Sequence, residues 1–195
     1  MSSTGIDKVL ILNETKSGNK TLEKLIIQGL KHPHAICEAL IDDKGIRLVR
    51  QGDYGLLILV TDIKNETAFK ACTLASHHPT ATIILIAEPY EENDKAALTA
   101  RDEFLEIGAT ILNKPLTKNS FLVAINSADM AHIRLCTLHK KIEEEKVISR
   151  SKLILVKTLS LTEDEAHKYI EKEAMNTGQT RLEVAYEIIS TYDYL

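Results

Sequence analysis

The residues best suited to chemistry lie near the C-terminus, where hydrogen-bond donors and cations gather around a turn at 176–181 that leads into a predicted helix. Lys172 lies one helical turn before this point, and Arg150 and Lys152 lie on an earlier predicted helix. A helix start exposes free backbone amides, so such a cluster suits phosphate groups and unpaired nucleobases. Taken alone, the same residues are also explained by a simple helix cap and a solvated arginine. The turn 176–181 contributes Asn176, Thr177, Gln179, Thr180 and Arg181.

The other reactive side chains lack useful spacing. Cys37, Cys72 and Cys136 are far apart and form no C-x-x-C pair, which favours buried, reduced thiols over a metal site or a disulfide framework. The seven histidines also lack ligand spacing, and no Ser/His/Asp or Cys/His group is concentrated in one segment. We therefore expect a protein that is not an enzyme and that has no structural metal.

The front of the chain alternates between strand-like and helix-like segments. Apolar runs at 8–12, 34–41, 56–60, 82–87 and 109–113 predict strands, and helical periodicity fills the gaps. The run 56–60 shows no alternation, which is typical of a strand buried on both faces. The pattern predicts an α/β fold, a five-stranded doubly wound parallel sheet of about 125 residues with functional groups at the carboxyl ends of its strands.

From Lys118 onward the sequence predicts only helices. Leu135, Leu138 and Ile142 have the a/d spacing of a short heptad seam, so we expect a long coiled-coil helix that pairs with a second copy. A lone solvated helix is the alternative. We expect three parts: a receiver/flavodoxin-like domain at 1–126, a coiled-coil linker at 127–147 and a three-helix all-α domain at 148–195.

Two capping boxes mark the helix starts of the tail. Thr162 and Glu165 form the first, and Thr180 and Glu183 form the second. Asn-Thr-Gly at 176–178 separates them and predicts a helix end. The tail should therefore be a compact three-helix unit.

The tail resembles an ANTAR domain over about 45 residues. The resemblance runs through SRSKLILV at 149–156, LTEDEAHKYIEKEAM at 161–175 and TRLEVA at 180–185, in the right order. It implies RNA-binding transcription antitermination, usually by a dimer that recognises paired hairpins in a leader transcript. On this basis we define the RNA-binding set as Arg150, Lys152, Lys172, Asn176, Thr177, Gln179, Thr180 and Arg181.

The charge balance of the tail departs from what RNA binding would favour. The chain has a net charge of −4, and residues 145–195 hold 7 Lys+Arg against 9 Asp+Glu, a balance of 7 − 9 = −2. Gly178 stands where ANTAR domains commonly carry a basic residue. Affinity that depends on counterion release then rests on locally placed cations and on dimerisation.

The front domain resembles a response-regulator receiver over about 120 residues. Such a domain needs a carboxylate pair for Mg²⁺, an acceptor aspartate, a hydroxyl and a lysine after successive strands, because hard oxygen ligands hold Mg²⁺ and lysine neutralises the phosphoryl charge. Only Glu14 and the Lys-Pro pair fit, so we predict a degenerate receiver. A shifted alignment would make Asp62 the acceptor, with Mg²⁺ on Glu14 and Asp62 and a sensor kinase as partner. Asn13 and Glu14 stand at the carboxylate pair and Val60 at the acceptor. Ala87 stands at the hydroxyl and Lys114 at the lysine.

Two alternatives concern the front domain. The segment 15–21 (TKSGNKT) resembles a flavodoxin phosphate loop that could hold FMN, with Tyr54 and Tyr90 as the candidates to flank the flavin ring. The domain could also be a docking module that a protein partner regulates without phosphorylation. No apolar run is long enough for a membrane span and the start of the chain has no signal-peptide pattern, so we expect a cytoplasmic protein without membrane contact.

Overall fold

The computed structural model describes residues 5–15, 20–30, 35–52 and 54–192. The chain divides into two compact units, 1–137 and 138–195. One helix, α5 (Lys118–Leu159), runs from the first unit into the second. The predicted linker and the first helix of the predicted tail are thus parts of the same helix.

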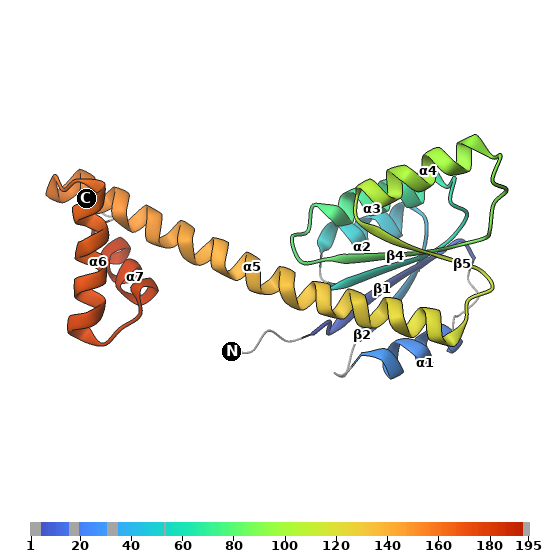
Figure 1. Ribbon diagram of the computed structural model, residues 1–195, viewed down its shortest axis with the longest axis horizontal. Helices are drawn as coiled ribbons and strands as arrows, with labels where there is room; N and C mark the ends of the chain where they lie inside the picture. Colours follow the sequence, from blue (N-terminus) through green and yellow to red (C-terminus); the bar gives the residue numbers. More distant parts are fainter. Residues whose placement is uncertain (1–4, 16–19, 31–34, 53, 193–195) are drawn as a thin grey trace. The chain divides into compact units, whose positions relative to one another are not determined.

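The first unit is built on a five-stranded parallel sheet (Figure 1). The strand order is β2-β1-β3-β4-β5, which is the predicted doubly wound arrangement. Neighbouring strands pair in register from end to end, with Asn13 opposite Val60 and Ala87 opposite Asn113. The strands are β1 (Lys8–Asn13), β2 (Ala35–Leu40), β3 (Leu56–Val60), β4 (Thr82–Ala87) and β5 (Ala109–Asn113).

Helices cover both faces of this sheet. The helices α2 (Asp43–Gln51), α3 (Glu66–Ser76) and α4 (Lys95–Glu106) lie on one face, and α1 (Lys20–Gly29) and the start of α5 lie on the other (Figure 1). The strand β3 contributes Leu57 and Leu59 to the first core and Leu56 and Ile58 to the second. Successive side chains of a strand point to opposite faces, so a strand without alternation must be buried on both sides. The prediction for 56–60 is confirmed.

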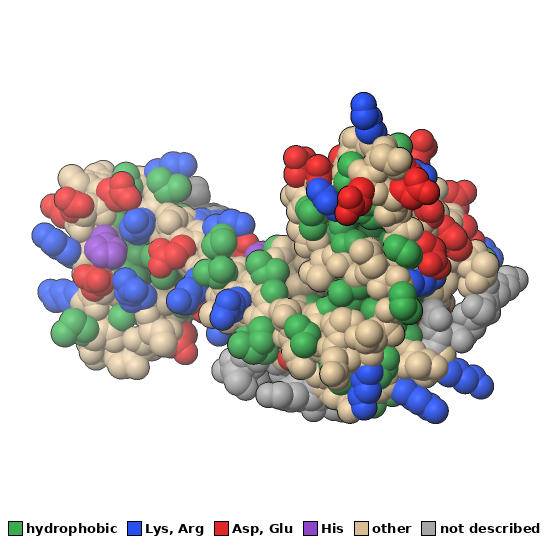
Figure 2. Space-filling view, turned by 45° about the vertical axis from the view of Figure 1, so that its right-hand side comes forward, with side chains coloured by type: hydrophobic (Ala, Val, Ile, Leu, Met, Phe, Trp, Pro, Cys, Tyr) green, Lys and Arg blue, Asp and Glu red, His purple; other side chains and the backbone are tan. Residues whose placement is uncertain are grey.

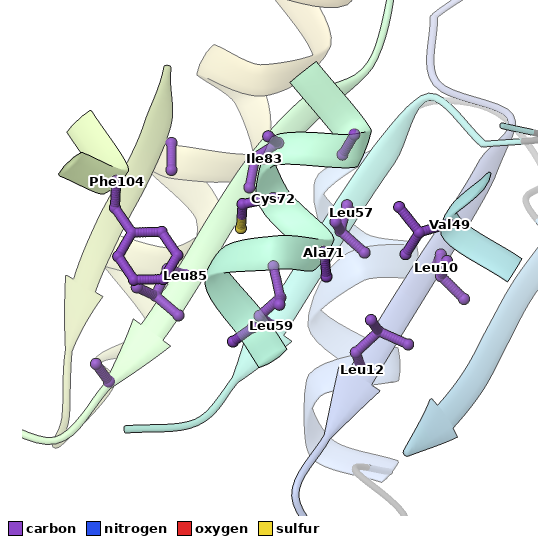
Figure 3. Packing of buried hydrophobic residues seen from close by; sticks show 14 of the residues in the cluster. Leu10, Leu12, Val49, Leu57, Leu59, Ala71, Cys72, Ile83, Leu85 and Phe104 are labelled. Carbon is purple, nitrogen blue, oxygen red and sulfur yellow. The ribbon is translucent and has the colours of Figure 1, made fainter. Parts of the chain in front are cut away.

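The core beneath α2, α3 and α4 is shown in Figure 3. Phe104 of α4, labelled in Figure 3, packs edge-on against Phe69 of α3, with 5.3 Å between the ring centroids. Cys72 is fully buried in the same core, and burial raises the pKa of its thiol to about 12. The prediction of a buried thiol is wrong for Cys37, which is exposed because it lies on β2 at the edge of the sheet, and Cys136 is half-buried.

Polar contacts fix the start of α5 to the first unit. His132 is buried, and its Nδ1 donates to the backbone carbonyl of Thr80 at 2.7 Å. Asp129 accepts a hydrogen bond from the backbone amide of Ile6 at 2.7 Å. Gly55 leaves space for the His132 ring, since a Cβ there would lie 2.9 Å from it. This part of α5 therefore belongs to the front domain by packing as well as by sequence.

The second unit packs α6 (Glu163–Thr177) and α7 (Arg181–Tyr192) with the end of α5. Both predicted capping boxes are present: Glu165 accepts from the Thr162 amide at 2.8 Å, and Glu183 accepts from the Thr180 amide at 2.7 Å. The predicted three-helix tail is confirmed. No helix in the described part of the chain combines the length and apolarity that a membrane crossing requires. The buried core of this unit is Ile148, Leu155, Ala166, Ile170, Ala174, Val184, Ala185 and Ile188.

Candidate functional sites

The central strands β3 and β4 end at the positions where the receiver resemblance places the acceptor and the hydroxyl. Val60 ends β3 beside Asn13 of β1, and Ala87 ends β4. Asn13 and Ala87 are buried, and Val60 packs partly against the core beneath α1 and α5. The two positions expected to hold the acceptor and the hydroxyl thus carry an apolar side chain and a methyl group.

Glu14, just beyond β1, is held by three donors from the segment after β3. One oxygen, Oε1, accepts from the Thr61 hydroxyl, from the Asp62 backbone amide at 3.2 Å and from Asn65 Nδ2 at 3.1 Å. Asn65 Nδ2 also donates to the Thr61 hydroxyl oxygen at 2.9 Å. These bonds, led by the one from Thr61, hold the pKa of the Glu14 carboxyl below its usual value. The network ties the loop after β1 to the loop after β3.

Asp62 lies in the turn that follows β3. The strand ends at Val60, as predicted, so Asp62 lies beyond its last paired residue. Its Oδ1 accepts from the backbone amide of Lys64 at 2.7 Å, which is local turn bonding. Within 5–15, 20–30, 35–52 and 54–192, no three His, Cys, Asp or Glu side chains are grouped to hold a metal ion. Oε1 of Glu14 and Oδ1 of Asp62 already accept hydrogen bonds from the fold, so neither of these two oxygens is open to Mg²⁺ in this arrangement.

Lys114 follows β5 at the edge of the sheet and forms an ion pair there. Its Nζ lies 2.9 Å from Oε1 of Glu88, which sequence reasoning did not identify, and both side chains are exposed. Lys114 also contributes to lowering the pKa of Glu14, after the larger effect of the hydrogen bonds. The lysine is therefore near the remnant site while its charge is partly balanced by Glu88.

The tyrosines proposed to flank a flavin lie at opposite ends of the sheet. Tyr54 is buried just before β3 and donates to the Val49 carbonyl, whereas Tyr90 follows β4. Because β3 and β4 are parallel, the two rings cannot sandwich one flavin. Most of the suggested phosphate loop, 16–19, lies outside the described residues.

In the second unit, several members of the RNA-binding set face carboxylates. Lys152 Nζ lies 3.1 Å from Glu163 Oε1, and Arg181 Nη1 lies 3.8 Å from Glu171 Oε1. Gln179 donates to Glu187, and the Thr177 hydroxyl donates to Gln179 at 2.7 Å. Figure 2 shows acidic and basic side chains interleaved on the visible face of this unit, at the left. The three glutamates were not predicted.

The turn between α6 and α7 has a backbone reason for its glycine. Gly178 has φ of +69°, in the left-handed region, and caps the C-terminus of α6. A basic side chain there would be strained, although a Cβ would meet no heavy atom within 4 Å. Gly178 thus ends the helix. Thr180 then begins α7 and places Arg181 in its first turn.

The remaining members of the set are positioned on exposed helix surfaces. Lys172 and Asn176 are exposed on α6, and Arg150 is exposed on α5. The structure also exposes two tyrosines that sequence reasoning missed, Tyr169 and Tyr186. Aromatic rings can stack on unpaired bases. Only the fold shows that these two tyrosines lie outside the buried core of the unit.

Comparison with known proteins supports both halves of this description. The ANTAR domain family matches residues 137–189. A two component transcriptional regulator AraC from Clostridium phytofermentans has a similar fold, with 16% identity over 66% of this chain and 97% of that chain and a TM-score of 0.50. A putative pilus assembly-related protein from Burkholderia pseudomallei gives 16% identity, 66% and 92% coverage and a TM-score of 0.50. No curated protein sequence matches the chain.

These findings agree with the geometry. The matched residues include the end of α5 and most of α6 and α7, the helices that pack the second core. At 16% identity, the structural similarity shows the receiver-like fold of the first unit and does not show its chemistry. Residues 137–189 therefore belong to the ANTAR domain family, and they follow a domain with the receiver-like fold.

Proposed function

We propose that this protein is a transcription antitermination regulator that binds hairpin-containing leader RNA through its C-terminal unit. The ANTAR match at 137–189 carries this proposal, because it falls on the helices that present the RNA-binding set. The front domain, 1–126, supplies the input, 127–147 is the coiled-coil linker and 148–195 is the output. Binding of this kind is regulatory and needs no catalytic group.

The RNA-binding set can act even though it is partly neutralised. The ion pair between Arg181 and Glu171 is exposed, with Arg181 half accessible to solvent. Exposed ion pairs contribute about 0–1 kcal/mol, so RNA phosphates can replace their carboxylates. Arginine binds phosphate with two parallel hydrogen bonds, which makes Arg181 at the start of α7 the principal contact.

A gel shift with a two-hairpin leader RNA tests this assignment. Arg181→Ala should weaken binding about 10-fold, in the range of one lost charged contact to RNA. Arg101→Ala is the matched control, because Arg101 lies on α4 of the front domain and pairs with Asp102. Equal binding by wild type and Arg181→Ala would remove Arg181 from the site. No binding by any of the three proteins would contradict the proposed function.

A second copy of the chain fits the exposed apolar face of α5. Leu138 is 56% exposed and Ile142 is 53% exposed, which is unusual for large apolar side chains one turn apart. A groove of about 570 Å³ continues along the same helix, lined by Ile142, Glu145, Ser149 and Leu153. The seam is flanked by the ion pair Lys140–Glu144, as in helices that pair through heptads.

Pairing along α5 would bring two ANTAR units to two hairpins. Two linked sites bind far more tightly than one, so the homodimer raises RNA affinity without further contacts. Ile142→Glu should convert dimer to monomer in light scattering and weaken binding to two-hairpin RNA more than to one-hairpin RNA. His139→Glu adds the same charge outside the seam. A wild-type monomer would overturn the coiled-coil assignment.

The input does not involve aspartyl phosphate in this proposal. Val60 and Ala87 replace the reactive groups, and Thr61 and Asn65 satisfy Glu14. We propose that a protein partner docks on the front domain and controls the output. Incubation with acetyl phosphate and Mg²⁺ should add no phosphoryl group by intact mass. A phosphoryl group on Asp62, lost in Asp62→Asn, would restore the sensor-kinase alternative.

A further inference from the structure

Glu171 contacts two basic side chains through a single oxygen. Its Oε1 lies 3.8 Å from Nη1 of Arg181 and 3.3 Å from Nε2 of His167. Glu171 and His167 are one helical turn apart on α6, and Arg181 reaches them from the start of α7. A carboxylate therefore stands where the phosphate of a ligand would meet the Arg181 guanidinium.

Two other members of the RNA-binding set, Lys152 and Gln179, also contact carboxylates. Glu163 contacts Lys152, and Glu187 accepts from Gln179. Residues 138–195 carry 9 Lys+Arg and 11 Asp+Glu, a balance of 9 − 11 = −2. The acids of α6 and α7 are thus placed against donors of the RNA-binding set. An RNA that approaches this surface meets partly neutralised donors.

We propose that Glu171 is an internal competitor of RNA phosphate for Arg181 and that it sets the affinity of the protein for RNA. Carboxylate and phosphate both accept hydrogen bonds from the guanidinium group, so only one of them can occupy it fully. When phosphate takes Arg181, His167 remains as a partner for the displaced carboxylate. The inference rests on the proposed RNA-binding function and adds a residue that opposes it.

The size of the effect follows from the exposure of the pair. Side-chain exposures of 50% for Arg181 and 47% for Glu171 place the contact in solvent. Removal of the competing carboxylate should therefore tighten RNA binding by about 2- to 5-fold, the equivalent of an exposed ion pair. The gain should shrink as salt rises, because salt screens exposed charges.

The test uses the full-length protein and fluorescence titration of a labelled two-hairpin leader RNA. The variants are Glu171→Gln, Arg181→Ala and the double variant, which together form a double-mutant cycle. Glu173→Gln is the matched control: it removes the same charge from the same helix, and two residues along a helix lie about 200° apart around its axis. Circular dichroism checks that each variant keeps its helices.

The expected result is tighter binding by Glu171→Gln alone, weaker binding by Arg181→Ala and no effect of Glu171→Gln when Arg181 is absent. Equal gains from Glu171→Gln and Glu173→Gln would show a net-charge effect and overturn the inference. So would unchanged binding by Glu171→Gln while Arg181→Ala binds weakly, an outcome that leaves the proposed function standing. Absence of RNA binding by wild type and by every variant would remove both proposals.

Discussion

Two glutamates, Glu14 and Glu171, make contrasting contacts in the two units. Glu14 is held by uncharged donors of the loop after β3, and the neighbouring strand β3 ends at the apolar Val60. Glu171 contacts His167 and Arg181, whose side chains can carry positive charge. Uncharged groups of the fold bind the first carboxylate, whereas the second makes an exposed contact with charged side chains.

The difference follows from burial and charge. Thr61 is buried, so its hydroxyl needs a partner inside the fold and finds it in Glu14. Arg181 and Glu171 are half-exposed, so water and salt compete for both of them. A hydrogen bond from a buried hydroxyl stabilises one arrangement, and an exposed ion pair permits exchange.

The largest effect should come from truncating one side chain in the core of the second unit. Leu155 of α5 is fully buried in the core that α5 shares with α6 and α7. Leu155→Ala should destabilise this unit by about 2–5 kcal/mol. RNA binding should fall with it. The front domain should keep its stability, because its cores are separate. Chemical denaturation followed by hydrogen exchange would measure both units, and equal loss of protection in the first unit would contradict their independence.

A smaller effect is expected at Glu14. Thr61→Val removes the main hydrogen bond to this carboxylate and should destabilise the front domain by about 1 kcal/mol, a low value for a charged acceptor because Glu14 is exposed. The pKa of Glu14 should rise toward its ordinary value, as measured by NMR titration. Thr73→Val is the control, since that hydroxyl bonds only to the Phe69 carbonyl within α3. An unchanged pKa in Thr61→Val would show that the network does not hold Glu14.

The smallest effect concerns the capping boxes of the second unit at low pH. Hydrogen bonds from Thr162 and Thr180 hold the pKa of Glu165 and of Glu183 below the ordinary value. A depressed pKa means that the ionised form stabilises the fold above the ordinary pKa of about 4.3, and that this stabilisation is lost as pH falls through the lower folded value. Helix content should therefore decline on acidification below about pH 4. Glu165→Gln should show a shallower decline in circular dichroism, and an identical acid profile would exclude this contribution.

Local sequence signals accounted for most of the elements. The capping boxes at Thr162 and Thr180 were visible because their partners lie three residues away, and both are present. The unbroken apolar run at 56–60 identified the central strand for a similar reason. The position of Asp62 was not predictable in the same way, because the end of β3 depends on where its neighbours stop pairing.

The sequence by itself determined the doubly wound sheet, the capping boxes and the ANTAR family of the tail, because all of these depend on residue types and short spacings. The tertiary structure alone decided which carboxylate meets which donor. Glu14 and Thr61 are 47 residues apart, and Lys114 and Glu88 are 26 apart. Contacts of that separation form only when the sheet and helices pack. Only the folded structure therefore shows that Thr61 donates to Glu14 and that Glu171 faces Arg181.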